Sequence, residues 1–250
     1  MRCLYADTAF FGEPVEAYFD DRKLFADLGV SLYLDHYPDY AFVARQVTGD
    51  RLQVTGDRLQ GVAHGTERGP SSPCPLSPVP CNLSPVTCNL SGYIVGSPHG
   101  DADVHRHLMA HLPAIVGRLV RGRYRLGRKT MLYYLDNALA WLRGQLLEIR
   151  DPAYPANLHI NVASSHRGQG LGWELLSAYL EHLQRCGVPG VHAVTTDHSR
   201  GAVRLFQKAG FRLLEEKSTS VWRRHLGRQV RLLGFGLRLD QDGPPPRRPS

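Results

Sequence analysis

The amino-acid sequence predicts an α/β fold in which helices flank a mixed, mostly antiparallel central sheet. An alternating apolar strand at 158–162 runs through a glycine-rich turn into a helix, and a second strand and helix follow at 191–196 and 201–209. Of the 250 residues, 42% are hydrophobic, which is enough for a packed core. No apolar run approaches the ~18–20 residues of a membrane span. We therefore expect a globular protein without a membrane segment.

The glycine-rich turn at 164–172, SSHRGQGLG, predicts a site for a pyrophosphate-bearing cofactor. A turn of this kind before a helix presents several backbone N–H groups to one anion, and the helix dipole adds to the attraction. Trp173 excludes two common phosphate motifs, because the P-loop needs a lysine there and the dinucleotide fingerprint needs a glycine. The pattern that remains is Arg167-x-x-Gly170-x-Gly172; a glycine-rich turn without a ligand is the alternative interpretation.

The elements after the turn alternate between helix and strand. The first helix has an apolar face made of Leu171, Leu175, Leu176, Tyr179, Leu180 and Leu183. It is expected to stop at Gly187, with Pro189 beyond. Ser199 is expected to cap the second helix, which ends at Gly210.

These motifs resemble the GNAT superfamily of N-acyltransferases. The turn at 167–172 is similar to the family's Gln/Arg-x-x-Gly-x-Gly/Ala signature, and AVRLFQKAGF at 202–211 is similar to its penultimate helix. The runs YPANLHINV at 154–162 and GVPGVHAVTT at 187–196 resemble a branch related to the acetyltransferase-like domain of O-GlcNAc hydrolases. The resemblance implies a sheet that splays between its fourth and fifth strands.

The resemblance also implies acetyl-CoA as cosubstrate. In the family, pantetheine pairs with the fourth strand, a backbone N–H near Val162 polarises the thioester, and the loop amides hold the pyrophosphate. Ser199 takes the place of the family's asparagine. The cofactor-binding residues carried over in this way are Ile160, Asn161, Val162, Arg167, Gly168, Gln169, Gly170, Leu171, Gly172 and Ser199.

The side chains for acid–base chemistry depart from the family pattern. Phe206 stands where many members have a tyrosine as general acid, and Asn161 stands where a carboxylate often serves as base. His159 and His192 are further candidates, since histidine titrates in the useful range, or they are structural residues. We therefore carry two hypotheses: an N-acetyltransferase acting on a primary amine of a small molecule or amino sugar, and a catalytically impaired acyl-CoA-binding module.

We expect one domain over 1–226, followed by a basic tail at 227–250 with a disordered end. Two insertions are expected within the domain. The segment 47–91 contains two copies of VTGDRLQ and three further seven-residue repeats, and is expected to be an expanded, disordered hairpin loop. The segment 103–148 is expected to be helical, over 104–120 and 130–149, and either shapes the substrate pocket or covers the sheet. The family's first strand is truncated or missing before the first helix.

The net charge of +7 is unevenly distributed, with six basic residues and no acid from 117 to 130. Such a patch could steer an anionic cofactor or contact nucleic acid, but no recognised nucleic-acid module is present, so nucleic-acid binding is not expected. None of the five cysteines forms a Cys-x-x-Cys pair, so no metal site is predicted. A reduced, cytoplasmic protein is expected; GNAT proteins often form homodimers, and no interface is specified here.

Overall fold

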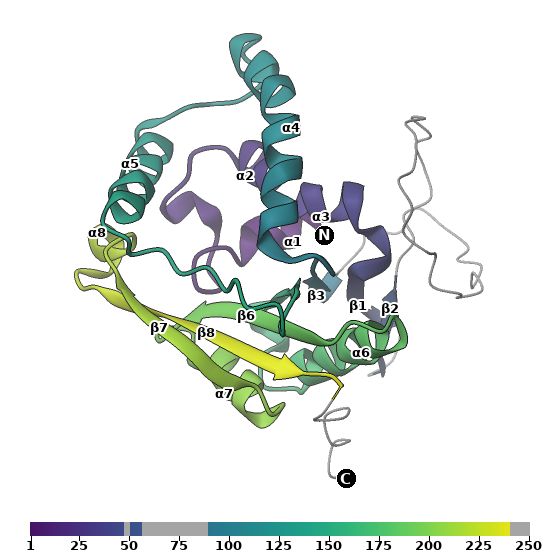
Figure 1. Ribbon diagram of the computed structural model, residues 1–250. Helices are drawn as coiled ribbons and strands as arrows, with labels where there is room; N and C mark the ends of the chain where they lie inside the picture. The colour runs from purple at the N-terminus through teal and green to yellow at the C-terminus, as the bar shows by residue number, and fades with distance from the viewer. Residues whose placement is uncertain (48–50, 57–89, 241–250) are drawn as a thin grey trace.

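The computed structural model describes residues 1–47, 51–56 and 90–240, whose strands form two four-stranded sheets (Figure 1). The first sheet has the order β2-β1-β3-β5, and every pair in it is antiparallel. Its strands are β1 (Ala41–Val47), β2 (Arg51–Gly56), β3 (Leu90–Val95) and β5 (His159–Val162). The second sheet has the order β4-β6-β8-β7 and consists of β4 (Ala156–Asn157), β6 (Gly190–Thr196), β8 (Val230–Arg238) and β7 (Arg212–Thr219). This arrangement confirms the predicted mixed, mostly antiparallel α/β fold.

The two sheets diverge at one residue, Leu158. Just before it, β4 pairs in parallel with β6, and the Leu158 N–H donates to the His192 carbonyl oxygen at 3.2 Å. Immediately after it, β5 leaves β6 and pairs with β3, from Val95 opposite His159 to Gly92 opposite Val162. The expected splay therefore begins at Leu158 and lies between β5 and β6.

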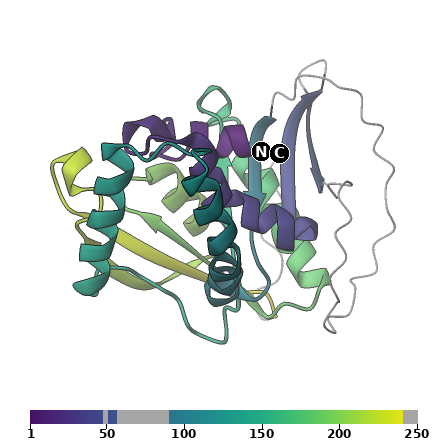
Figure 2. The same cartoon turned by 90° about the horizontal axis from the view of Figure 1, so that it is seen from above.

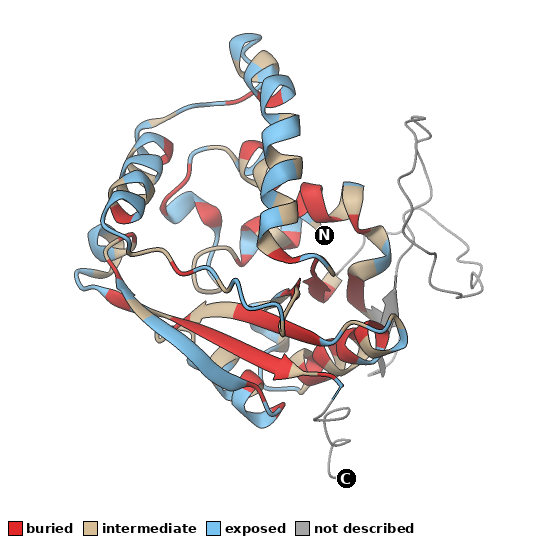
Figure 3. Cartoon of the chain, viewed as in Figure 1, coloured by how far each residue is buried: buried red, intermediate tan, exposed pale blue. Residues whose placement is uncertain are grey.

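Helix α6 (Leu171–Arg185) holds the two sheets together. Its predicted apolar face is buried, and the main core cluster joins it to residues of both sheets and of α7 (Arg200–Lys208). In Figure 3, β6 and β8 are mainly buried, and Figure 1 shows α6 and α7 on the same side of the second sheet. Because α6 packs on both sheets, its position fixes the splay between them.

The opposite face of the first sheet is covered by the N-terminal helices. These are α1 (Arg2–Asp7), α2 (Arg22–Leu28) and α3 (Val30–His36), with the short 3-10 turns η1 (Val15–Ala17) and η2 (Pro38–Tyr40) between elements. A second core cluster joins Leu4, Val30 and Tyr33 to the β3 residues Tyr93 and Val95. The first sheet is thus enclosed between α6 and the N-terminal layer.

Two helices form as expected around the segment 103–148, α4 (Gly100–Val120) and α5 (Arg128–Leu142), but α5 ends at Leu142 and not at the expected 149. Seen from above, α5 lies on the far side of the molecule from β1 and β2 (Figure 2). The leucines spaced along α5 do not form its buried face: Leu135 and Leu142 are 50% and 71% exposed, whereas Thr130 and Ala140 are buried. The reason is polar and aromatic docking, because Thr130 hydrogen-bonds to Asp20 and the Tyr133 ring packs at a tilt against Tyr18, with the ring centroids 5.0 Å apart.

The expected tail at 227–250 is wrong in its first half. The helix α8 (Arg223–Leu226) leads into β8, which lies between β6 and β7 in the second sheet. Leu233, Phe235 and Leu237 alternate along β8 and are buried, so the strand belongs to the core. The arginines of this segment had suggested a basic tail. The apolar residues that alternate between them instead place the segment in the core as a strand. Residues 241–250 lie outside the described part of the chain.

The repeat insertion at 47–91 is also corrected in part. Arg51–Gly56, which spans the junction of the two VTGDRLQ copies, forms β2 and pairs with β1 from Phe42 opposite Gly56 to Val47 opposite Arg51. This strand occupies the sheet edge beside β1. The rest of the predicted loop, 48–50 and 57–89, lies outside the described residues.

Gly96 is required by a close approach between the two halves of the fold. A Cβ at this position would overlap the Asn157 carbonyl oxygen and the Tyr179 hydroxyl, which hydrogen-bond to each other at 2.9 Å. We expect Gly96→Ala to lower the free energy of unfolding by about 2–3 kcal/mol, because overpacking of a well-packed site costs this much. Urea unfolding measures the change. Gly201→Ala is the control, because nothing lies within 4 Å of its Cβ; equal stabilities for the two variants would contradict the close approach.

Candidate active site

The glycine-rich turn leads into the N-terminus of α6, and two of its glycines adopt positive φ angles. After the 3-10 turn η3 (Ser164–His166), Gly168 and Gly170 have φ values of 77° and 86°, in the left-handed region. Gly170 is the N-cap residue of α6. The first amides of any helix lack intrahelical acceptors, and here they follow a loop with little side-chain bulk. This geometry suits a pyrophosphate group, as the sequence predicts.

The side chain of Arg167 does not extend along the loop but folds back over the end of β5. Its Nε donates to the Val162 carbonyl oxygen at 3.2 Å, and a terminal nitrogen donates to the Gly12 carbonyl oxygen at 3.1 Å. Gly12 has a φ of 97°, and a Cβ there would overlap the guanidinium. The N-terminal segment is therefore tied to the cofactor loop through Arg167.

The backbone of β5 presents alternate residues to the splay. The Leu158 N–H points to β6, while the Ala163 N–H donates to Ser91 beside β3. Because N–H groups alternate in direction along a strand, those of Ile160 and Val162 point away from β3 and into the splay. Among the strands that the structure describes, none pairs with them within the splay, so this edge is available to an extended ligand.

The side chains of β5 divide between the two faces of the first sheet. Ile160 and Val162 pack against the core around α6. On the other face, His159 Nε2 lies 2.9 Å from the Tyr33 hydroxyl, and the Asn161 amide donates to the Tyr93 hydroxyl at 2.6 Å. The predicted residues His159 and Asn161 thus lie together, on the face covered by the N-terminal helices.

A pocket of about 230 Å³ adjoins His159 and receives residues from α1, α3 and α4. It is lined by Tyr5, Leu28, Gly29, Leu32, Tyr33, Val95, Asp101, Val104, His105, Leu108 and His159. The walls combine apolar side chains with two imidazoles, those of His105 and His159, and the Asp101 carboxylate. Helix α4, from the predicted insertion, therefore forms one wall of a concave site beside β5.

His192 lies behind this pocket and forms an ion pair with Asp101. Its Nδ1 contacts the Tyr154 carbonyl oxygen at 2.8 Å, and its Nε2 lies 3.2 Å from an Asp101 carboxylate oxygen. Both partners accept hydrogen bonds, so both ring nitrogens must carry protons and the ring is an imidazolium. The second Asp101 oxygen accepts from the Asn157 amide, whose own oxygen accepts from the Ser97 N–H at 2.7 Å.

The two histidines are shifted in opposite directions. Burial lowers the pKa of His192, but the hydrogen bonds to Asp101 and the Tyr154 carbonyl outweigh it, and the net pKa is raised. His159 is exposed at the pocket, yet desolvation by the surrounding protein atoms lowers its pKa, with the His192 charge acting in the same direction against the attraction of Asp101. The surroundings therefore favour the neutral form of His159 and the charged forms of Asp101 and His192.

Asp101→Asn is expected to reduce stability most between about pH 4 and 6.5. The folded pKa of Asp101 is lowered from 3.8 and that of His192 is raised from 6.5, so both groups are charged throughout this range. The stability that His192 contributes is lost as the pH rises through its folded pKa, and that of Asp101 as the pH falls through its own. Urea unfolding of both proteins at pH 3, 5.5 and 8.5 measures the gap.

The difference in the free energy of unfolding between the wild type and Asp101→Asn should be small, because 44% of the Asp101 side chain is exposed and solvent screens the ion pair. A gap that is equal at all three pH values would contradict the ion pair.

Two residues that depart from the family pattern, Phe206 and Ser199, lie in α7 and at its start. Phe206 is 2% exposed and packs against Phe211 and Phe235, with ring centroids 5.2 and 5.8 Å apart, so it lies in the core and away from the solvent. Ser199 is the N-cap residue of α7 as predicted, but its side chain does not cap the helix; the hydroxyl lies 3.2 Å from the Thr196 hydroxyl instead. Neither side chain supplies an acid to the splay.

Sequence reasoning missed Asp101 and Tyr33. Asp101 lies in the first turn of α4, where an acid is expected simply to favour the helix dipole. Tyr33 is one of several aromatic residues on a buried helix. Their proximity to His192 and His159 depends on contacts across 91 and 126 residues, for which the sequence carries no local signal.

Among the described residues, no group of three or more histidine, cysteine or acidic residues is arranged to hold a metal ion. Within the same residues, no helix is both long and apolar enough to cross a membrane.

Comparison with known proteins gives one family match. Residues 127–211, which include the glycine-rich turn, α6 and α7, match the acetyltransferase (GNAT) family. No curated protein sequence matches the chain. This segment is therefore similar to GNAT acetyltransferases, which supports acetyl transfer in general; the hydrolase-related branch is not confirmed.

Among solved structures, SsHAT aligns with 95% of this chain and 91% of its own, at 19% identity and a TM-score of 0.53. The Salmonella typhimurium protein yncA, solved with its cofactor acetyl-CoA, aligns at 17% identity over 63% of each chain, with a TM-score of 0.35. Escherichia coli ribosomal-protein-S18-alanine N-acetyltransferase aligns with 35% of this chain and 56% of its own, at 22% identity and a TM-score of 0.30. The likeness to SsHAT shows a shared fold.

Proposed function

We propose that this GNAT-type acyl-CoA N-acyltransferase moves the acetyl group of acetyl-CoA to a primary amine of a small molecule or amino sugar. The observation that carries the proposal is the splay at Leu158. It leaves the inward-facing backbone of β5 unpaired next to the N-terminus of α6. An extended pantetheine arm and a pyrophosphate need these two features side by side.

In this proposal the cofactor is held mainly by backbone groups. Amides of the 167–172 loop bind the pyrophosphate, and the Ile160 and Val162 N–H groups face the pantetheine and thioester. The Val162 N–H hydrogen-bonds the carbonyl oxygen as negative charge develops on it. Backbone recognition explains how the site can persist while the side chains Asn161, Phe206 and Ser199 differ from the family pattern.

We assign His159 as the general base. Its lowered pKa leaves the imidazole neutral at pH 7, so it can accept a proton from the attacking amine. The amine nitrogen forms a bond to the thioester carbon, the C–S bond breaks, and the thiolate of CoA leaves. Asp101 faces the same pocket, where its negative charge attracts an ammonium substrate before deprotonation.

The proposed acceptor, an amino sugar, depends on the proposed branch of the GNAT superfamily. The runs at 154–162 and 187–196, which resemble the domain found with O-GlcNAc hydrolases, favour an amino sugar. The pocket beside His159 has a volume of about 230 Å³, which accommodates a small molecule. Its mixed apolar and polar walls are compatible with a sugar ring.

A catalytically impaired acyl-CoA-binding protein is the second candidate. It is favoured by Phe206, which is buried in the core and carries no hydroxyl to protonate the thiolate. The two candidates differ in turnover and share cofactor binding.

Two measurements test the proposal. Calorimetric titration with acetyl-CoA should give micromolar affinity, about −8 kcal/mol. Thiol release should then be followed with glucosamine, with other primary amines, and with N-acetylglucosamine as the amine-blocked control. Amine-dependent release supports the enzyme, binding without release with any amine supports the second candidate, and no binding to folded protein overturns both.

A further inference from the structure

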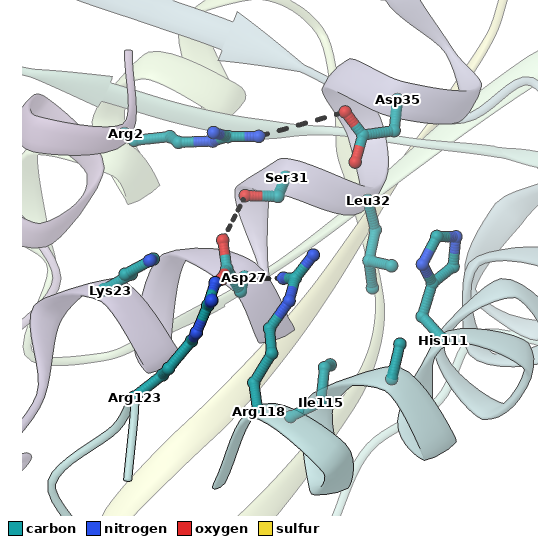
Figure 4. A pocket seen from close by; sticks show the side chains of 11 residues that line it. Arg2, Lys23, Asp27, Ser31, Leu32, Asp35, His111, Ile115, Arg118 and Arg123 are labelled. Carbon is teal, nitrogen blue, oxygen red and sulfur yellow. Dashed lines mark hydrogen bonds and ion pairs between the residues drawn. The ribbon is translucent and has the colours of Figure 1, made fainter. Parts of the chain in front are cut away.

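A second, larger pocket lies in the N-terminal helical layer and is not used by the proposed reaction. Its volume is about 340 Å³, and it is formed by α1, α2, α3, α4 and the turn after α4 (Figure 4). It is lined by Arg2, Lys23, Asp27, Ser31, Leu32, Asp35, His111, Ala114, Ile115, Arg118 and Arg123. No residue of the splay or of the 167–172 loop takes part in it.

The acids of this pocket already have partners. Asp27 accepts from the Tyr124 hydroxyl at 2.7 Å and from Ser31 and Arg118 at 3.4 Å each. Asp35 lies 3.9 Å from the Arg2 guanidinium. Both carboxylates are therefore neutralised within the pocket wall.

Two cations remain without acidic partners among the described residues, Lys23 and Arg123. Figure 4 shows Arg118 and Arg123 running side by side past Asp27, with Lys23 directed toward the same space. The four cations outnumber the two carboxylates, and they come from α1, α2, α4 and a turn. Bringing like charges together costs free energy unless an anion lies between them.

The backbone holds Arg123 at the pocket. Gly122 ends α4 with a φ of 67°, and its N–H donates to the Leu119 carbonyl oxygen at 2.9 Å. The Arg123 N–H then donates to the Arg118 carbonyl oxygen at 2.9 Å. This glycine-terminated turn reverses the chain after α4, so that Arg123 returns beside Arg118.

We propose that this pocket binds a small molecule bearing a phosphate group. Lys23, Arg118 and Arg123 contact the phosphate, and the apolar side chains of Leu32, Ala114 and Ile115 contact the remainder of the ligand. A guanidinium presents paired donors that match phosphate oxygens, and a lysine adds a compact charge. The six basic residues of the 117–130 run are thereby divided: two line a concave site, and the other four lie outside it.

The pocket also adjoins the candidate active site. Leu32 lines both pockets, and the next residue, Tyr33, contacts His159 through its hydroxyl. A ligand bound against one side of α3 thus lies one helix away from the proposed base.

Inorganic phosphate is the probe for this proposal. Thermal unfolding is measured while phosphate replaces chloride at constant ionic strength, with the Lys23→Gln/Arg123→Gln double variant beside the wild type. The wild-type midpoint should rise with phosphate, because a ligand that binds the folded state stabilises it. At least half of that rise should be lost in the double variant. Arg121→Gln is the matched control, since Arg121 is exposed, bonds to the Gly117 carbonyl and does not line the pocket.

The outcomes separate this site from the acetyl-CoA site. The double variant should bind acetyl-CoA with unchanged affinity in calorimetry, whether or not the protein proves to be an enzyme. An equal phosphate response in wild type and double variant overturns the proposal, as does an equal loss in Arg121→Gln. A tenfold weaker affinity for acetyl-CoA in the double variant also overturns it, because the cations would then belong to the cofactor site.

Discussion

Gly170→Asp is expected to abolish acetyl-CoA binding, weakening it at least 100-fold in a calorimetric titration. Gly170 caps α6 at the point where the proposed pyrophosphate meets the first helical amides. An aspartate there places a Cβ and a negative charge at the anion site, and its carboxylate competes for the same N–H groups. Aspartate is among the residues that tolerate a left-handed backbone best, so the protein should remain folded.

The matched control is Gly187→Asp, at the other end of the same helix. Gly187 also has a positive φ, 69°, and nothing lies within 4 Å of a Cβ there. This variant carries the same backbone strain and the same charge, but it is remote from the cofactor loop. It should bind acetyl-CoA as the wild type does. Unchanged affinity in Gly170→Asp would place the cofactor elsewhere on the protein.

His159→Ala is expected to lower kcat by about 100-fold or more while leaving acetyl-CoA affinity unchanged, because a positioned general base contributes ~10²–10⁴-fold. In the wild type, activity should rise with pH through the pKa of His159, which desolvation holds below 6.5. In the variant that rise should disappear, and activity should increase only at the higher pH where the free amine itself loses its proton. Steady-state rates from pH 5 to 10 measure both effects.

His99→Ala is the control for this experiment. His99 is exposed and precedes α4, two residues from Asp101, but it does not line the pocket beside His159. Its replacement should leave both kcat and the pH profile unchanged. Activity within threefold of wild type in His159→Ala would exclude His159 as the base and leave the backbone of β5 as the main contributor.

Local signals predicted the cofactor half of the fold well. The period of α6, the glycines at 168 and 170 and the strand at 190–196 each depend on neighbouring residues, so their pattern is complete within a short window. The same applies to α4, whose length differs by only a few residues from the expected 104–120. Short-range patterns therefore sufficed to predict these elements and a site for a pyrophosphate group, while acetyl-CoA and the splay were implied by the resemblance to GNAT proteins.

Long-range contacts decided what the sequence could not predict. The leucines of α5 have a clean helical spacing, yet the helix docks through Thr130 and Tyr133 because the N-terminal segment supplies Asp20 and aromatic rings there. The arginines of β8 suggested a basic tail, so the alternation of its apolar residues was not recognised as a strand. Asp101 reaches His192 only when the start of α4 packs over β4 and β6. Each of these outcomes depends on tertiary partners that no local pattern specifies.

The division of one strand between two sheets at Leu158 sets where this chain can change length during evolution. Adding or deleting a residue within 156–162 would turn His159 and Asn161 toward the core and bring Ile160 and Val162 to the opposite face, because side chains alternate along a strand. The register with β3 and with β6 would be disturbed in a single step. The helices α4 and α5 lie in the connection between β3 and β4, where added residues leave that alternation intact. Length variation among relatives should therefore gather in the connections and spare the seven residues that join the two sheets.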